Sequence, residues 1–428
     1  MPTGQGVSVT QVESLVDGSY RPSTSSFPSK VFSFPSGGNS TASSHATTAG
    51  AYFYGSGSLS PSVGEGNASI TVYEVNSWVG TGSLRATTAS LLPKSETAPI
   101  QSHSWIGTTN NATLDTQILQ RFDYMLDRDN VVAAIALNNG NGPVPSLMAQ
   151  SHNALAVGLS NGGHSFGSTT FDGSGRTKPS IVVPAGATSW AAPTVASAAA
   201  LLLQKASATA GLSNGTKALA IRSILLAGAS KDEEEFSSPW NHTESSPLDA
   251  RYGAGELDVV SSYRILTAGE YSPSSTSLVG SEGWSFSSVS SQSTACYFFD
   301  LNSATPLSLT ANLVWNSKVT PFDTNPSPLA VSYDFTTFVP NLDLRLYSAS
   351  GFTLGTQIAA SLSTLDNLEL IYAMGLLPGR YALSVSSDSN EVDYSLAWTA
   401  AVPEPSSWIL LLLAFPLVRA FHLRSRKA

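Results

Sequence analysis

The pattern of hydrophobic and polar positions divides the chain at about residue 270. Before that point, short runs of apolar residues alternate with longer segments of helical periodicity. Such runs are typical of strands buried on both faces, and strands that alternate with helices form a mostly parallel sheet covered on both sides. The expected strands are Val7–Val12, Ile70–Val75, Val131–Leu137, Ala154–Gly158 and Ile181–Val183, and the expected helices are Leu114–Asp127, Trp190–Gln204 and Lys217–Leu226.

After about residue 270 the pattern changes to strands with no convincing helix between them. Clusters of Gly, Pro, Asn and Ser separate these strands, which is typical of an antiparallel sandwich. The expected strands are Thr294–Leu301, Leu307–Trp315, Leu342–Tyr347, Leu368–Met374, Arg380–Val385 and Tyr394–Trp398. The sequence therefore predicts an α/β domain in residues 1–272, an all-β sandwich in residues 275–400 and a separate tail in residues 402–428.

Composition narrows the range of partners. The chain has 428 residues, of which only 12% are charged, and its formal net charge is −9. It carries no long Lys/Arg clusters, so nothing indicates a nucleic-acid partner. Cys296 is the only cysteine, which excludes an internal disulfide. No cofactor is expected, and because no dense carboxylate loop appears, structural calcium is left open.

Ser189 is the most informative candidate for chemistry. It stands where the alanine-rich helical pattern begins, and a helix that is apolar on every face is buried. The free N–H groups at a helix N-terminus favour negative charge developing on a nearby oxygen. Pro193 is expected in the first turn, where its missing N–H has no partner in any case. On these residues alone, Ser189 is either a nucleophile or a helix N-cap.

A family resemblance bears on this choice. The segment Gly186–Pro193 reads G-A-T-S-W-A-A-P and resembles the serine motif G-T-S-x-A-x-P of the subtilisin-like serine peptidases, or subtilases. Arg176–Pro184 resembles the strand that leads to this motif, and Arg251–Leu257 resembles a segment that closes many subtilase domains. Ala187 departs from the motif, where glycine is usual. The resemblance implies a three-layer subtilisin-like domain with Ser189 as nucleophile.

The same resemblance supplies a base and an acid. Ser43–Gly50 resembles the family motif H-G-T-H-V-A-G, which makes His45 the expected base, with Thr48 in place of the second histidine. The first strand aligns without gaps to the family's V-x-V-A-V-I-D and has Glu13 at the position of the aspartate. Asp17 is the rival carboxylate, four residues further on.

Two further segments resemble substrate-handling parts of the family. Val131–Gly142 resembles the stretch that carries the oxyanion asparagine, which the alignment places at Asn138, with Asn139 as the alternative. Residues 102–107 resemble the strand that pairs with the substrate backbone, and this implies contacts with an extended peptide. The expected substrate-binding residues are Ser104, Trp105 and Gly107.

The C-terminal part resembles two known modules. Leu342–Gly351, Leu377–Tyr381 and Tyr394–Trp398 resemble bacterial pre-peptidase C-terminal domains, which are β-sandwich accessories of secreted peptidases. Residues 402–406 read V-P-E-P-S and precede an apolar run and basic residues. Together they resemble the PEP-CTERM sorting signal of Gram-negative bacteria, and a plain C-terminal anchor is the alternative.

The sorting signal implies cleavage by an exosortase and transient membrane association through residues 408–423. It also implies export to the cell envelope or the medium. Residues 1–12 contain neither a basic n-region nor an apolar h-region, so no signal peptide is visible. We therefore expect the chain to begin late and to lack its export signal.

Two functions remain open from the sequence. The first is an exported serine endopeptidase that hydrolyses polypeptides through an acyl-enzyme, using Glu13, His45 and Ser189. The second is a catalytically impaired subtilase-fold surface protein that acts as a binding module. Glu13, Thr48 and Ala187, which depart from the family motifs, suggest this alternative.

Overall fold

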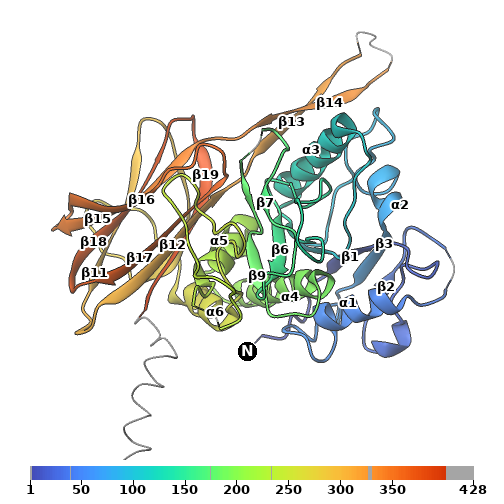
Figure 1. Ribbon diagram of the computed structural model, residues 1–428, viewed down its shortest axis with the longest axis horizontal. Coiled ribbons are helices and arrows are strands. Elements are labelled where there is room, and N and C mark those ends of the chain that lie inside the picture. The colour runs from blue at the N-terminus through green and yellow to red at the C-terminus, as the bar shows by residue number, and fades with distance from the viewer. Residues whose placement is uncertain (1, 39, 174, 233, 326–329, 402–428) are drawn as a thin grey trace, which may run out of the picture.

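A parallel sheet forms the centre of the first part of the molecule (Figure 1). The structure is a computed structural model and describes residues 2–401 except 39, 174, 233 and 326–329. Within these residues the sheet has seven strands in the order β2-β3-β1-β4-β5-β6-β9, and all neighbours run parallel. The strands are β1 (Val9–Glu13), β2 (Phe32–Ser33), β3 (Ile70–Glu74), β4 (Ile100–His103), β5 (Val132–Ala136), β6 (Leu155–Leu159) and β9 (Ile181–Val183).

Helices cover this sheet on both faces, as the continuous apolar strands require. Alternate residues of β5 belong to different cores: Val132, Ala134 and Ala136 pack in the core that contains α1 and α4, whereas Ala133 and Ile135 pack in the core that contains α3. The helices are α1 (Ser44–Tyr54), α2 (Val75–Gly80), α3 (Ala112–Asp129), α4 (Thr188–Ser207), α5 (Ala218–Gly228) and α6 (Val259–Ala268).

Two antiparallel sheets build the second part and enclose a core of their own. Their orders are β10-β19-β12-β17 and β11-β18-β15-β16. The strands are β10 (Glu282–Val289), β11 (Thr294–Leu301), β12 (Leu307–Trp315), β15 (Leu342–Ser350), β16 (Thr353–Ser361), β17 (Leu368–Leu376), β18 (Gly379–Ser387) and β19 (Val392–Ala401). The predicted fold class, an α/β domain with a mostly parallel sheet followed by an all-β sandwich, is confirmed.

Shorter elements complete the described chain. A hairpin of β13 (Lys318–Asp323) and β14 (Tyr333–Phe338) leaves the sandwich and lies along α3, where Phe335 packs against Tyr124 (Figure 1). The other short elements are β7 (Gly167–Ser168), β8 (Thr177–Lys178) and the 3-10 turns Thr24–Ser26 and Ser213–Thr216.

One hydrophobic core cluster contains residues of both parts. All residues of α5 are buried, because the sheet of β10, β19, β12 and β17 covers the side of α5 that the α/β part alone would expose. Val314, Leu370 and Ala397 of the sandwich belong to the same core cluster as α4 and α5. At the polar part of the contact, Ser223 and Ser395 share a hydrogen bond of 2.7 Å. The sandwich therefore stabilises the α/β part.

The predicted tail, residues 402–428, lies outside the described residues, and so does the apolar segment 408–423. Among the residues that the structure does describe, no helix is long and apolar enough to cross a membrane.

Candidate active site

Ser189 lies in the first turn of α4. The helix begins at Thr188, two residues earlier than predicted, so Pro193 is its sixth residue and does not lie in the first turn. Because proline has no N–H, the carbonyl of Ser189 lacks the helical donor four residues on. The Ser104 hydroxyl replaces it and donates to that carbonyl at 3.0 Å. Ser104 therefore fixes the backbone of the candidate nucleophile.

The N-cap of α4 explains why Ala187 can stand where glycine is usual. Ala187 has φ −158° and ψ 152°, which is extended backbone that any residue adopts. Thr188 secures the next position, since its hydroxyl donates to the Leu137 carbonyl at 2.6 Å. The departure at Ala187 therefore causes no strain at the start of the helix.

Glu13 and His45 meet at the carboxyl end of β1. Glu13 is the last residue of β1 and is fully buried, while His45 lies in the first turn of α1, whose N-cap is Ser43. The Nδ1 atom of His45 lies 2.8 Å from Oε2 of Glu13. The longer glutamate side chain thus reaches the imidazole at hydrogen-bonding distance, and the His45 side chain keeps 23% of its surface exposed.

Gln11 holds the carboxylate of Glu13, and Tyr54 in turn holds the side chain of Gln11. Gln11 is two residues before Glu13 on β1, so both side chains lie on the same face of the sheet. The side-chain N–H₂ of Gln11 donates to Oε1 of Glu13 at 2.8 Å and to the carbonyl of Ala46 at 3.0 Å. Oε1 of Gln11 accepts from the Tyr54 hydroxyl at 2.6 Å. The Glu13 carboxylate therefore has both oxygens engaged and a fixed orientation.

The Glu13–His45 contact shifts the pKa values of both side chains. Burial raises the pKa of the Glu13 carboxyl, and the hydrogen bonds from His45 and Gln11 oppose that rise. The hydrogen bond to Glu13 raises the pKa of His45 above its ordinary value, and partial burial opposes it. A histidine with a raised pKa becomes neutral, and able to accept a proton, only as the pH rises through that raised pKa.

Trp190 brings His45 next to the nucleophile segment. Its ring centroid lies 5.1 Å from that of His45, and it also stacks on the Tyr52 ring at 6.1 Å. No hydrogen bond joins His45 to Ser189 in the part of the chain that is described; in free enzymes this contact is often long and shortens only when substrate binds. His45 and Ser189 are thus neighbours without a direct bond.

The rival residues of the site lie elsewhere or have other partners. Asp17 is exposed and has φ 53°, in the turn between Val16 and Ser19, so it does not approach His45. Thr48 lies on α1, where its hydroxyl donates to the carbonyl of Ser44 at 3.0 Å. Of the two candidate carboxylates, only Glu13 is in contact with the histidine.

Asn139, rather than Asn138, reaches the start of α4. Its Oδ1 accepts from the backbone N–H of Thr188 at 2.9 Å. Because the Thr188 N–H can bond only to an acceptor, the Asn139 side-chain oxygen must point toward it, and the Asn139 Nδ2 group is left to donate elsewhere. Asn138 contributes its backbone, which donates to the Ser165 hydroxyl and accepts from the Ser165 N–H. Among the described residues, no hydrogen bond uses the N–H of Ser189, so two donors are free here.

The expected substrate-binding residues have different surroundings. Trp105 is buried and donates from Nε1 to His103 at 3.2 Å. Gly107 uses both backbone groups to pair with Leu147, so these groups are engaged within the chain. Ile106 is 44% exposed, and within the described chain no hydrogen bond uses its backbone. Ile106 is therefore an exposed position after β4 whose backbone groups are open to a peptide.

Gln11, Trp190 and Ile106 did not emerge as site residues from the sequence. A polar residue two positions before Glu13 in an apolar strand is a usable signal, because alternate residues share a face. Nothing in the pattern indicates that Trp190 turns toward His45, since that contact depends on how α1 packs against α4. In the portion that the structure describes, no cluster of His, Cys, Asp and Glu side chains could hold a metal ion.

Solved structures similar to this chain are protease domains. The self-cleaved protease domain of PatA has 19% identity and a TM-score of 0.40, covering 62% of this chain and 99% of that one. The epidermin leader peptide processing serine protease EpiP from Staphylococcus aureus has 17% identity and a TM-score of 0.38, covering 60% and 75%. MycP1 without its N-terminal propeptide has 19% identity and a TM-score of 0.35, covering 61% and 92%.

Sequence comparisons add nothing further: no protein-family model matches the chain, and no curated protein matches it. Because the identities and TM-scores of the solved structures are low, the function proposed below is argued from the geometry of the site.

Replacing Asn139 tests the oxyanion donor. We expect Asn139→Ala to lower kcat for peptide hydrolysis by about a hundred- to a thousandfold, because one donor to the developing oxyanion is lost. Asn139→Asp, which keeps an acceptor for Thr188 but removes the N–H₂ group, should lose at least as much. Asn138→Ala is the matched control and should change kcat little. A larger loss in Asn138→Ala than in Asn139→Ala would return the role to Asn138.

Proposed function

We propose that the protein is a serine endopeptidase that hydrolyses extended polypeptides through an acyl-enzyme. The observation that carries this proposal is the 2.8 Å contact between buried Glu13 and His45, next to a helix that begins at Thr188 and presents Ser189. Nucleophilic hydrolysis by a serine uses a carboxylate that orients a histidine and a histidine that takes the proton of the serine hydroxyl, and Glu13, His45 and Ser189 supply these groups.

Each residue has a defined task in the proposed reaction. The Ser189 hydroxyl attacks the peptide carbonyl carbon, and its proton passes to Nε2 of His45. Glu13 accepts from Nδ1, which holds the tautomer and stabilises the imidazolium. The N–H of Ser189 and the Nδ2 of Asn139 donate to the oxyanion. His45 then returns the proton to the leaving amine, and water hydrolyses the ester in a second, equivalent step.

The alternative, a catalytically impaired binding module, rests on three departures from the family motifs. Glu13 nevertheless bonds to His45, Ala187 has an extended backbone, and Thr48 makes an ordinary helix contact. None of the three removes a group that the reaction needs. No observation in the described site favours the binding module over the peptidase.

The remaining proposals rest on sequence resemblance. We propose that residues 1–272 form a subtilisin-like peptidase domain and residues 275–400 an accessory sandwich of the pre-peptidase C-terminal type. Residues 402–428 are proposed as a PEP-CTERM signal for an exosortase, with transient membrane association through 408–423. Export in a Gram-negative bacterium follows from that signal.

The pH profile of peptide hydrolysis tests the Glu13–His45 pair. His45 must be neutral to act as a base, so kcat/KM of the wild type should rise with pH through the raised pKa of His45, above the ordinary 6.5. Glu13→Gln removes the charge that raises this pKa. It should move the acidic limb to lower pH and lower kcat by about 10⁴-fold.

The matched control for this variant is Glu65→Gln, which changes a carboxylate that lies outside the site and pairs with Lys30. It should keep the wild-type profile. A folded wild-type chain that hydrolyses no extended peptide would overturn the proposed function. Unchanged activity of Glu13→Gln would remove Glu13 from the mechanism.

A further inference from the structure

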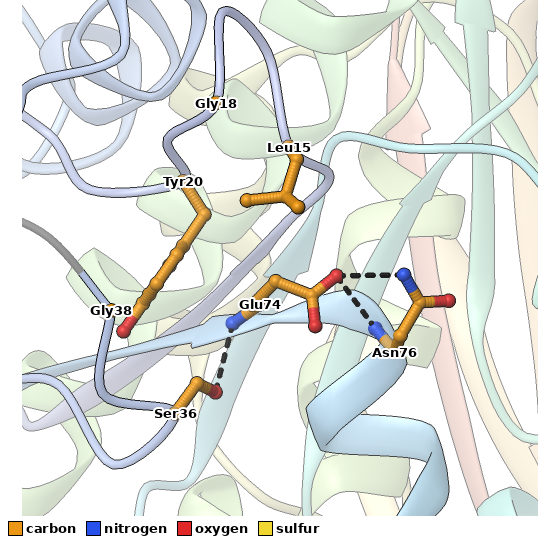
Figure 2. A pocket seen from close by; sticks show the side chains of 7 residues that line it. All are labelled: Leu15, Gly18, Tyr20, Ser36, Gly38, Glu74 and Asn76. Atoms are coloured by element: carbon orange, nitrogen blue, oxygen red, sulfur yellow. Dashed lines mark hydrogen bonds between the residues drawn. The ribbon is translucent and has the colours of Figure 1, made fainter.

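A pocket of about 390 Å³ lies beside the candidate active site, at the carboxyl ends of β3 and β1 (Figure 2). Glu74 is the last residue of β3 and is the register partner of Glu13 on the neighbouring strand. The pocket is lined by the loop after β1, the segment before α1 and the start of α2, with Leu15, Tyr20, Ser36, Gly38, Glu74 and Asn76 among its residues. The pocket thus starts one strand away from the proposed acid.

The lining carries a single formal charge, and this charge is negative. Oε1 of Glu74 accepts from the backbone N–H and the side-chain N–H₂ of Asn76 at 3.0 and 2.9 Å, and Oε2 accepts from the N–H of Ser77 at 2.8 Å. These bonds fix the carboxylate and leave one acceptor site on it, at Oε2, and they leave the Asn76 side-chain oxygen as a further acceptor. Among the described lining residues there is no Lys, Arg or His.

Arg21 is the cation nearest to this lining along the chain, and it has other partners. Its guanidinium donates to the carbonyls of Gly37 and Gly38 at 2.7 and 3.3 Å and lies 4.5 Å above the ring of Phe34. It is therefore not paired with Glu74, which caps the N-terminus of α2 and has no ion-pair partner among the described residues.

Apolar groups face the carboxylate across the pocket. The Leu15 side chain is 55% exposed, and the Tyr20 ring, which is largely buried and extends toward Gly38, lines the pocket as well (Figure 2). A long cationic side chain has the matching chemistry, because its methylene stem packs on apolar surface while its charged end keeps polar partners. Glu74 and Asn76 supply acceptors for that end.

The order of strands in the sheet sets the distance from the scissile bond. β3, β1 and β4 are consecutive strands, so the carboxyl ends of β3 and β4, at Glu74 and His103, lie about 10 Å apart, at about 4.8 Å per strand. An extended peptide advances about 3.3–3.6 Å per residue. A substrate bound along the segment that follows β4 therefore spans the distance to the pocket in about three residues.

We propose that this pocket is a specificity subsite for a Lys or Arg side chain within about three residues of the scissile bond, a proposal that rests on the proposed peptidase function. The test uses the Ser189→Ala chain, which binds peptides without cleaving them. Fluorescent decapeptides carry one Arg, or its neutral isostere citrulline, at each of three positions on either side of a fixed central dipeptide. Binding is measured by fluorescence anisotropy.

At one of these positions the Arg peptide should bind about five- to tenfold tighter than the citrulline peptide, and added salt should reduce the difference. With Glu74→Gln, which keeps an acceptor for the start of α2, the two peptides should bind equally. Glu391→Gln, the same change at an exposed position in the sandwich, should keep the preference for Arg.

Equal binding of the Arg and citrulline peptides at every position, or no binding of either, would overturn the subsite. A preference that survives Glu74→Gln would also overturn it. Hydrolysis by the wild type separates this result from the proposed function. A preference for Arg without hydrolysis would leave a binding site for a basic side chain and overturn the peptidase, whereas hydrolysis without a preference would keep the peptidase and overturn the subsite.

Discussion

Replacing Ser189 by alanine is expected to lower kcat for peptide hydrolysis by about a millionfold, and replacing His45 by alanine should cost about as much. The reason is that a hydroxyl without its base, or a base without its hydroxyl, performs no part of the proposed reaction. The double variant should therefore be no slower than either single one. This lack of additivity distinguishes two groups that act as a unit from two that contribute independently.

Two matched controls accompany these variants. Ser245→Ala changes an exposed serine in a turn, and His242→Ala changes a half-buried histidine outside the site. Both should retain wild-type kcat. Losses that simply multiply in the double variant, or equal losses in the controls, would contradict the assigned roles. The measurement is kcat for an extended chromogenic peptide, with thermal unfolding recorded for each variant.

Removing the sandwich is expected to unfold the α/β part. A chain that ends at residue 272 exposes the face of α5 that β12 and β19 cover, including aliphatic side chains such as Leu219, Ile224 and Leu225. Uncovering three such side chains costs about 5–9 kcal/mol, at about 1.5–3 kcal/mol each. Domains are stable by only about 5–15 kcal/mol, so the loss is comparable with the whole free energy of unfolding.

Thermal unfolding checks this expectation. The truncated chain should show no cooperative transition and no peptide hydrolysis. In the full chain, Leu370→Ala, at the shared core, should destabilise by about 2–5 kcal/mol while both parts still unfold in one transition. Leu344→Ala, in the core of the sandwich alone, is the comparison and should lower the same single transition. A truncated chain with an unchanged Tm would contradict the dependence.

The sequence contained most of the architecture, because fully buried strands leave a strong pattern. β1, β5, β6 and β9 were predicted within two residues at each end. α2 was missed, since its six residues are too few for a helical period to emerge. β16 was missed because its first six residues are exposed on both faces, which leaves no alternation between apolar and polar positions. The contact between α5 and the sandwich depends on tertiary packing, so the sequence of α5 itself does not indicate it.

The candidate site was predictable where a residue type and a motif coincide. The positions of Ser189, His45 and Glu13 followed from the family resemblance, and the resulting roles remain predictions. The choice between Asn138 and Asn139 could not be made, because two identical neighbours differ only in which one turns toward Thr188. The use of Ser104 depends on the exact start of α4, since that start decides whether Ser189 lies inside the helix, where Pro193 leaves its carbonyl without a donor.

Covalent labelling of the nucleophile tests the central claim most directly. The full chain is incubated with a fluorophosphonate probe, digested, and the modified peptide is identified by mass spectrometry. We predict one adduct per chain, on Ser189, which His45→Ala abolishes and Glu13→Gln slows strongly. A folded chain that carries no adduct on Ser189, or one that is labelled there equally well after His45→Ala, would contradict the claim that these residues form a hydrolytic site.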